Sequence, residues 1–195
     1  TGSISRQFIF TNDNGVFKDI SINTGINHKG QDISALTADY DNDGYLDILV
    51  LNNRRSRLYK NDGNGTFMDM AYATGIGFKS NSVQAKFIDY DLEGDLDLFI
   101  ATESTNQLYR NNGDGTFTDV SEKSGTIGEP VHSSDMLFGD FDDDGDVDMV
   151  VLNPAGTSRF YDNRRQGIFS DISDRAGLDF VGQPSCIVMG DYNND

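Results

Sequence analysis

Nearly continuous apolar runs recur along the chain, each with one acidic residue near its start. A short run of this kind is typical of a β-strand that is buried on both faces. The runs are Leu46–Leu51, Leu96–Ala101 and Val147–Leu152. Shorter apolar segments flank each run, so each unit predicts four short strands. In the first complete unit, we predict the strands at Ser34–Tyr40, Leu46–Leu51, Arg57–Asn61 and Thr66–Met70.

A polar turn with the pattern Asn-x-Gly-x-Gly follows each third predicted strand. Glycine and asparagine tolerate the left-handed conformations that tight turns need, so the pattern predicts a β-hairpin. Two copies agree almost position for position, a third is looser and a fourth is one residue shorter. They are Tyr59–Asp69, Tyr109–Asp119, Tyr161–Asp171 and Phe10–Asp19. One phenylalanine recurs with the same period and is predicted to lie in the core, as Phe17, Phe67, Phe117 and Phe169.

A nine-residue acidic segment separates the first and second predicted strands of each unit. In the copy that starts at Asp140, carboxylates at alternate positions can converge as the backbone curls, and Gly145 permits the positive φ that the curl needs. A backbone carbonyl at position seven and a carboxylate at position nine complete the six or seven oxygens that Ca²⁺ prefers. An EF-hand loop has the same order of ligands but ends on a Glu and lies between helices. We predict Ca²⁺ rather than Mg²⁺, which keeps more of its water.

The acidic segment recurs along the chain, and the last copy is cut off by the chain end. The copies start 50, 51 and 51 residues apart, so they belong to the same repeat as the strands. The predicted calcium ligands are Asp39, Asp41, Asp43, Tyr45 and Asp47; Asp89, Asp91, Glu93, Asp95 and Asp97; Asp140, Asp142, Asp144, Asp146 and Asp148; and Asp191, Asn193 and Asp195. Glu93 replaces Asp at position five, and its extra methylene group is expected to weaken the second site.

The repeat predicts an all-β fold, a β-propeller of four-stranded antiparallel blades with calcium loops. A β-solenoid is the structural alternative, but its coils are usually shorter and lack a hairpin turn. We predict one propeller region over residues 1–195, with three complete blades and two partial ones. The divisions are 1–30, 31–80, 81–130, 131–182 and 183–195.

The two ends of the chain are predicted to hold incomplete blades. Residues 1–20 would supply the last two strands of an earlier blade, and residues 184–195 the first strand of a later one. We therefore expect a piece of a larger propeller. Alternatively, the partial blades meet, within one ring or between copies. Cys186, the single cysteine, lies in an apolar run and is predicted to be a buried thiol.

The composition argues against several kinds of partner. The net charge of −17 argues against nucleic acid and anionic membranes, because binding to phosphate groups needs a basic surface. No apolar stretch approaches the ~20 residues of a membrane span. The 36% of hydrophobic residues is nevertheless enough for a folded chain.

The two motifs together resemble a known family. Asp-x-Asp-x-Asp-Gly-x-x-Asp followed by Leu-Tyr-x-Asn-x-Gly-x-Gly-x-Phe-x-Asp is similar to the FG-GAP/VCBS repeats of integrin α-like propellers, over essentially the whole chain. The residues at 39–44 and 112–117 are most similar to the bacterial and cartilage-acidic-protein branch. The resemblance implies an extracellular or periplasmic propeller, usually of seven or eight blades. It also implies that the calcium hairpins share one face with the Asn-x-Gly turns.

The opposite face should carry any ligand site, because such a site has to come from residues that break the repeat. The candidates are Arg54, Arg55 and Arg57, His28 with Asp32, His132 with Asp135, and Glu103. The arginines could bind an acidic glycan or a carboxylate. The ordinary interpretation, which we favour, is that these are solubilising arginines and surface histidines.

The function predicted from the sequence is that of a calcium-binding, secreted propeller that acts as a binding or adhesion module for protein or carbohydrate. One alternative is an architectural subunit that self-associates through its open blade edges. Another is a propeller-type polysaccharide lyase or other carbohydrate-active enzyme. Few glutamates lie outside the acidic segments and no nucleophile motif is present, so we predict that the chain is not an enzyme.

Overall fold

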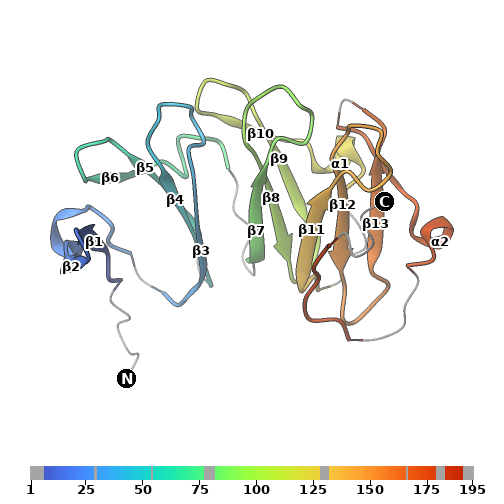
Figure 1. Ribbon diagram of the computed structural model, residues 1–195, viewed down its shortest axis with the longest axis horizontal. Helices are drawn as coiled ribbons and strands as arrows, with labels where there is room; N and C mark the ends of the chain where they lie inside the picture. The colour runs from blue at the N-terminus through green and yellow to red at the C-terminus, as the bar shows by residue number, and fades with distance from the viewer. Residues whose placement is uncertain are drawn as a thin grey trace.

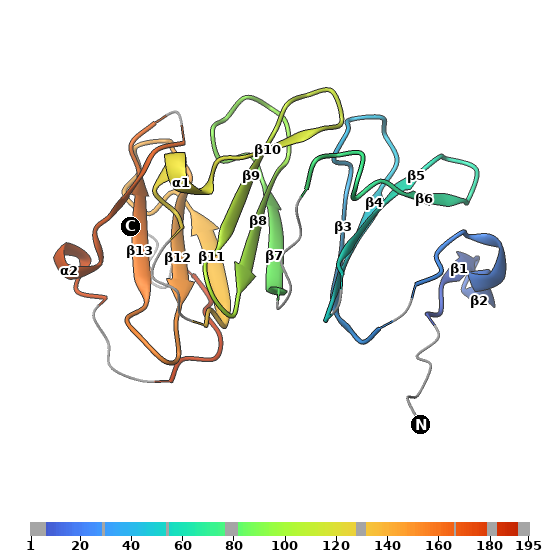
Figure 2. The ribbon, with the colours of Figure 1, turned by 180° about the vertical axis from the view of Figure 1, so that it is seen from behind.

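The computed structural model describes residues 7–28, 30–53, 55–76, 82–127, 132–165, 167–178 and 183–190. Within these residues the strands form three four-stranded antiparallel sheets and one two-stranded sheet. We call the three larger sheets the first, second and third blades. Figure 1 shows them side by side, and Figure 2 shows the same arrangement from behind.

Each blade is built from consecutive strands. The first blade contains β3 (Asp32–Ala38), β4 (Asp47–Asn52), β5 (Arg57–Asn61) and β6 (Phe67–Asp69). The second contains β7 (Ser82–Ile88), β8 (Asp97–Thr102), β9 (Gln107–Asn111) and β10 (Phe117–Asp119). The third contains β11 (Asp135–Gly139), β12 (Asp148–Leu152), β13 (Arg159–Asn163) and β14 (Phe169–Asp171). The predicted blades are therefore confirmed, and the four predicted strands of the first blade differ from the observed bounds by at most two residues.

The three blades share one register, so equivalent residues occupy equivalent places. The tyrosine of the third strand lies opposite the second residue of the second strand in each blade. The pairs are Ile48 with Tyr59, Leu98 with Tyr109, and Met149 with Tyr161. A residue that differs between copies of the repeat therefore lies in an otherwise similar environment, so equivalent positions of the three blades can be compared directly.

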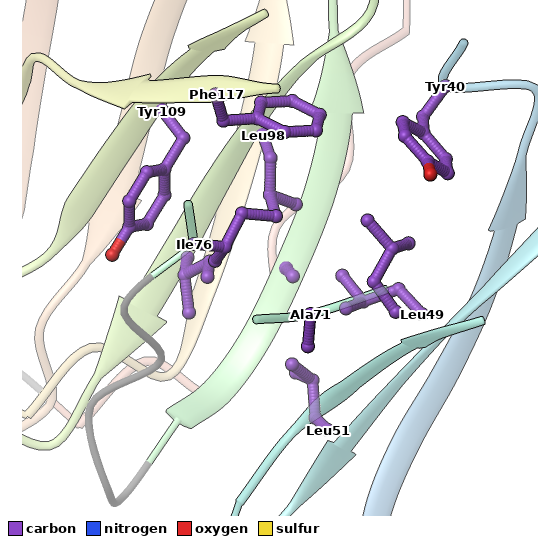
Figure 3. Close-up of a cluster of buried hydrophobic side chains, with 11 residues drawn as sticks. Tyr40, Leu49, Leu51, Ala71, Ile76, Leu98, Tyr109 and Phe117 are labelled. Carbon is purple, nitrogen blue, oxygen red and sulfur yellow. The ribbon is translucent and has the colours of Figure 1, made fainter. Parts of the chain in front are cut away.

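The core lies between neighbouring blades. Figure 3 shows the first cluster, in which Leu49 and Leu51 of β4 meet Leu98 of β8. The next residue of β8, Phe99, belongs to a second cluster with Met149 of the third blade. Alternate residues of β8 thus pack against opposite neighbours, which explains why the second strand of the repeat is apolar without interruption. Each blade depends on its neighbours for burial of its apolar faces.

The glycine that closes each unit allows the next blade to approach. A Cβ atom at Gly25, Gly75 or Gly125 would lie 2.6, 3.1 or 2.8 Å from a carbonyl oxygen of the following blade. All three residues also have a positive φ, which favours glycine. Any other residue would therefore strain the backbone and separate the blades.

Short helical turns, which were not predicted from the sequence, follow the N-terminal hairpin, the second blade and the third blade. They are η1 (Ser21–Asn23), α1 (Ser121–Ser124) and α2 (Ser173–Ala176). The last two end at Gly125 and Gly177 in the left-handed conformation, a common way to end a helix. No helix among the described residues is long and apolar enough to cross a membrane.

The recurring phenylalanine is buried only where a preceding blade packs against it. Phe117 contacts the ring of Tyr40, and Phe169 contacts that of Tyr90, with centroids 5.9 and 6.0 Å apart. Both phenylalanines are buried, whereas Phe17 is 68% exposed. The prediction that Phe17 is a core residue is wrong, because the hairpin of β1 (Phe10–Asp13) and β2 (Val16–Asp19) has no blade packed over it.

Two predictions for the C-terminal segment are also wrong in the part that the structure describes. Residues 183–190 form no strand, although they lie against the third blade through a hydrogen bond from Ile187 N to Asp135 Oδ2. Cys186 is exposed rather than buried. A strand needs a paired neighbour, and none of the described strands pairs with this segment.

Candidate metal centres

Each blade carries a cluster of three carboxylates in the loop between its first and second strands. The clusters are Asp39, Asp41 and Asp43; Asp89, Asp91 and Asp97; and Asp140, Asp142 and Asp148. Within each cluster, one oxygen from every residue lies within 4.8 Å of the others. The first two loops lie along the upper edge of the molecule in Figure 1. Each cluster can therefore offer several ligands to a metal ion.

The aspartate at position one shapes each loop by accepting backbone hydrogen bonds. Its Oδ2 atom accepts the N–H of the loop glycine, over 2.9 Å at Gly44, 3.0 Å at Gly94 and 3.1 Å at Gly145. These glycines have φ values of 90°, 94° and 90°. The predicted curl with a positive φ is thus present in all three loops.

The residue before position five also has a positive φ in every loop. Asn42, Leu92 and Asp143 have φ values of 56°, 58° and 58°. Asparagine and aspartate tolerate this conformation, whereas a leucine in it is strained. The backbone is therefore held in one curled form even where the residue disfavours it, which turns the acidic side chains inward.

The aspartate at position nine is buried at the end of the loop and holds it through hydrogen bonds from backbone N–H groups. Asp47, Asp97 and Asp148 are each 1% exposed, and each accepts two backbone N–H groups. Burial raises the pKa of Asp47 to about 6 and that of Asp97 to about 7, against the opposing effect of these hydrogen bonds. Burial also raises the pKa of Asp148. A nearby cation would favour the charged form of each group.

Two buried oxygens in the clusters lack a hydrogen-bond partner. They are Asp41 Oδ1 and Asp89 Oδ1. An unsatisfied buried oxygen of a carboxylate is costly, and a divalent cation would satisfy it. Together with the all-oxygen donor set, these orphaned atoms fit a hard cation such as Ca²⁺.

The structure brings together only part of each predicted ligand set. Glu93 and Asp95 lie outside the second cluster of side chains, and Asp95 Oδ1 accepts a 2.7 Å hydrogen bond from Asn42 of the first loop. The predicted ligand at position seven is the backbone carbonyl, so the role of Asp95 stays a prediction. Asp146 Oδ2 lies 3.4 Å from Arg165 Nε. Tyr45, Asp47 and Asp144 also lie outside the clusters, and their roles as ligands stay predictions. Asp191, Asn193 and Asp195 lie outside the residues that the structure describes.

Asparagines at the end of the third strand join neighbouring blades beside the clusters, and the sequence analysis missed them. Asn111 Nδ2 donates to Tyr40 O of the preceding blade over 2.7 Å and to Leu96 O over 3.0 Å. Asn163 donates to Tyr90 O and to Val147 O over 2.9 and 3.1 Å. The signal was the recurring Tyr-x-Asn, which we interpreted only as part of a turn.

Replacement of Asn111 by alanine is expected to destabilise the chain by about 2 to 3 kcal/mol, because two carbonyl oxygens lose their donor at a buried contact. Asn112→Ala is the matched control, since its side chain is exposed and bonds only within its own hairpin. Urea unfolding of both variants measures the difference. Equal stability of the two variants would show that the contact between blades contributes nothing.

The residues predicted on the opposite face turn out to be largely structural. His28 is buried, with Nδ1 2.9 Å from the Tyr59 hydroxyl and Nε2 2.7 Å from Asp32 Oδ1, so its interpretation as a surface histidine is wrong. Burial raises the pKa of Asp32, but hydrogen bonds from Asn52 and His28 outweigh it and lower the pKa.

Arg57 was predicted to break the repeat, and this prediction is wrong. It forms an ion pair with Asp69, and Arg159 at the equivalent position pairs with Asp171 over 2.9 Å. Asp135 accepts the backbone N–H groups of Met136 and Ile187, and it forms no hydrogen bond or ion pair with His132 in the part of the chain that the structure describes. Arg55 and Glu103 are exposed, and Arg54 lies outside the described residues.

These blades and acidic loops define an all-β repeat protein with the fold of a propeller segment. The chain belongs to the FG-GAP-like repeat family, whose model matches residues 2–50, 39–100, 89–151 and 140–195. The resemblance seen in the sequence is thereby confirmed. No curated protein matches the chain significantly.

Among solved structures, the chain is similar to a lectin from Agrocybe aegerita that is described as specifically recognising non-reducing terminal N-acetylglucosamine. The TM-score is 0.53 at 20% sequence identity. The match covers 84% of this chain and 45% of that chain, so this chain spans less than half the length of the lectin. At this identity the likeness shows the fold.

Proposed function

We propose that this chain is a calcium-stabilised propeller segment of a secreted glycan-binding protein. The observation that carries the calcium part is the carboxylate cluster in each described loop, with buried oxygens that lack a partner at Asp41 and Asp89. Bound Ca²⁺ would neutralise the cluster and cross-link the two strands of the hairpin. Asp39, Asp41 and Asp43 would hold it in the first blade, Asp89, Asp91 and Asp97 in the second, and Asp140, Asp142 and Asp148 in the third.

The proposed location outside the cell or in the periplasm follows from the same loops. Loops of this kind in extracellular modules bind Ca²⁺ with dissociation constants of about 0.1 to 1 mM. At millimolar Ca²⁺, each loop would gain roughly 0.4 to 1.8 kcal/mol of stability. Cytosolic Ca²⁺ is far too low to fill such sites, so a chain that relies on them suits a compartment with abundant calcium.

A hollow between the second and third blades supports a glycan as the ligand. Its volume is about 660 Å³, within the range of small-molecule sites. The wall combines a cation, hydrogen-bonding groups and apolar atoms, contributed by Arg110, Thr118, Lys123 and Ile168 among others. Such a mixture suits the hydroxyl and acetamido groups of a sugar. The fold similarity to a lectin adds to this proposal.

The same hollow favours binding over catalysis. Of its acidic residues, Asp91 belongs to the second cluster and Glu93 lies in the same loop, where a bound cation would favour the charged form of a carboxylate. The third, Asp119, accepts hydrogen bonds from the N–H and the hydroxyl group of Ser121. An acid–base pair for cleavage of a glycosidic bond would need carboxyl groups that are not committed to a metal.

A glycan array probed with the whole chain in millimolar Ca²⁺ tests the proposal. We expect retention on glycans that end in an N-acetylhexosamine, and we expect Arg110→Met to reduce it at least tenfold through loss of a charge-assisted hydrogen bond. Lys86→Met, which removes a cation outside the hollow, is the control. No binding to any glycan by a chain that melts as a calcium-loaded fold would refute the glycan part.

Association between copies is a second candidate, favoured by apolar side chains at both ends of the described chain. Phe10, Val16 and Phe17 are exposed in the N-terminal hairpin, and Val188 and Met189 near the other end. An uncovered blade end is a surface on which a further blade can pack. The mass of the particle in solution distinguishes this function from that of a single-chain binding module.

A further inference from the structure

One position of the repeat changes its charge from blade to blade beside the acidic loops. It lies in the third strand, one residue after the recurring tyrosine, and is occupied by Lys60, Arg110 and Asp162. The register is the same in each case, because these residues pair with Met68, Thr118 and Ser170 of the fourth strand. The three loops therefore differ in the charge that the neighbouring strand presents to them.

In the first blade this residue reaches into the carboxylate cluster. Lys60 Nζ donates to Asp43 Oδ2 over 2.6 Å and also forms a hydrogen bond with Asp41 Oδ2. Both carboxylates belong to the cluster of the first loop. The ammonium group thus neutralises two of the three acidic side chains that would hold a metal ion.

In the other two loops of the described chain, no ion pair joins a cation to a carboxylate of the cluster, although Arg165 lies 3.4 Å from Asp146 in the third loop. Arg110 forms no described ion pair with the second cluster, and its Nε atom is buried without a hydrogen-bond partner. Asp162 brings a further carboxylate towards the third loop, and its own partners are Arg164 at 3.0 Å and Arg175 at 3.5 Å. The lysine contact is thus specific to the first blade.

We propose that Lys60 is a built-in counter-ion that competes with Ca²⁺ for the first loop, so that this loop is the weakest of the three calcium sites. The inference rests on the calcium sites proposed above. To bind Asp41 and Asp43, the ion must displace the ammonium group, which costs two charge-assisted hydrogen bonds. The displaced positive charge remains close to the ion and repels it.

The three loops should behave differently when Ca²⁺ is scarce. The first loop keeps a cation when Ca²⁺ is scarce and stays folded, whereas no ion pair within the second or third cluster offsets the repulsion between its carboxylates. Loss of calcium would then loosen the second and third blades before the first. The hollow beside Arg110 would be lost early, so ligand binding would follow occupancy of the second and third sites.

A calcium titration of Lys60→Met in the whole chain, followed by NMR, tests the proposal site by site. The amides of Gly44, Gly94 and Gly145 are suitable reporters, since each donates to the first aspartate of its own loop. In the unmodified chain, we expect Gly44 to respond at the highest calcium concentration. In the variant, its midpoint should fall roughly tenfold, the effect of removing a partly exposed cation with two charge-assisted bonds.

The midpoints of Gly94 and Gly145 should not move in the variant. Lys18→Met is the matched control, because Lys18 pairs with Asp13 outside all three loops, and it should leave every midpoint unchanged. Lys60→Gln provides a second variant that keeps hydrogen-bonding capacity without charge, and it should lower the Gly44 midpoint as well. If Lys60→Met fails to fold without calcium, the titration runs downward from the loaded state.

The possible results separate the two proposals. If none of the three amides responds to Ca²⁺ in the unmodified chain, the calcium sites themselves are refuted. If Gly94 and Gly145 respond but the Gly44 midpoint is unchanged or higher in both Lys60 variants, Lys60 does not compete with the ion and the inference is overturned.

Discussion

Removal of calcium is expected to lower the melting temperature of the chain by roughly 2 to 20 °C at pH 7.5, and Mg²⁺ is expected to restore little of the loss. Three loops that each gain roughly 0.4 to 1.8 kcal/mol account for this range, at about 2 to 4 °C per kcal/mol for a chain of this size. Thermal unfolding of calcium-free and calcium-loaded protein measures the shift. Identical melting curves would contradict the account.

The effect of calcium should also depend on pH. In the ion-free fold, the pKa values of Asp47 and Asp97 are raised by burial to about 6 and about 7, above the ordinary value of ~3.9. Between the pKa of the unfolded carboxyl groups and the higher pKa of the folded ones, the folded chain binds more protons than the unfolded chain. The free energy of unfolding of the ion-free protein therefore falls as the pH rises from about 4 to about 7. Calcium should therefore raise the melting temperature less at pH 5 than at pH 7.5.

The second large effect is expected from Asp97→Ala, which should destabilise the chain by about 3 to 4 kcal/mol. Asp97 is 1% exposed and accepts the N–H groups of Tyr90 and Asn111, over 3.2 and 2.8 Å. Alanine removes a metal ligand and leaves both buried donors unsatisfied. The loss should appear with calcium and without it.

Asp97→Asn separates the two roles of this residue. Asparagine keeps one acceptor oxygen, so it can still accept one of the two backbone N–H groups of Tyr90 and Asn111, but it turns an NH2 donor towards the other and is a poor calcium ligand. We expect it to abolish the gain from calcium at the second loop while costing about 1 to 2 kcal/mol in ion-free protein, less than Asp97→Ala because one buried donor rather than two is left unsatisfied. If both substitutions destabilise ion-free protein equally, the hydrogen bonds to Tyr90 and Asn111 are not what makes Asp97 important.

Much of the fold could be predicted from the sequence because the same pattern of strands and loops recurs in each copy of the repeat. The apolar run Leu96–Ala101 predicts a strand covered on both faces, and Leu98 and Phe99 do face different neighbouring blades. The acidic segments likewise predict the curled loops, since Gly44 and its equivalents have the positive φ that the curl requires.

The prediction of burial from the repeat was wrong where a repeated side chain has no neighbouring blade packed against it. Phe17 matches Phe117 in the repeat but is exposed, because only Phe117 has a tyrosine from a preceding blade against its ring. Cys186 was likewise predicted to be buried, and it is exposed. A periodic pattern reports the environment of an average copy, whereas burial depends on which blades are present.

The candidate site was predictable in outline and not in detail. The ligand spacing identified the loops, but it could not show that Asp95 turns towards Asn42 or that Lys60 enters the first cluster. These contacts cross between loops and strands, so they depend on the distance between blades rather than on local sequence. The arrangement of Asn111 against Tyr40 was missed for the same reason.

Direct titration of the calcium-free chain with Ca²⁺ by isothermal calorimetry tests the central claim most directly. The account predicts binding of at least three ions per chain, one for each carboxylate cluster in the described residues, with dissociation constants of about 1 mM or below. It also predicts that Asp97→Asn removes one of them. The absence of calcium binding up to several millimolar, or an unchanged number of ions in Asp97→Asn, would contradict it.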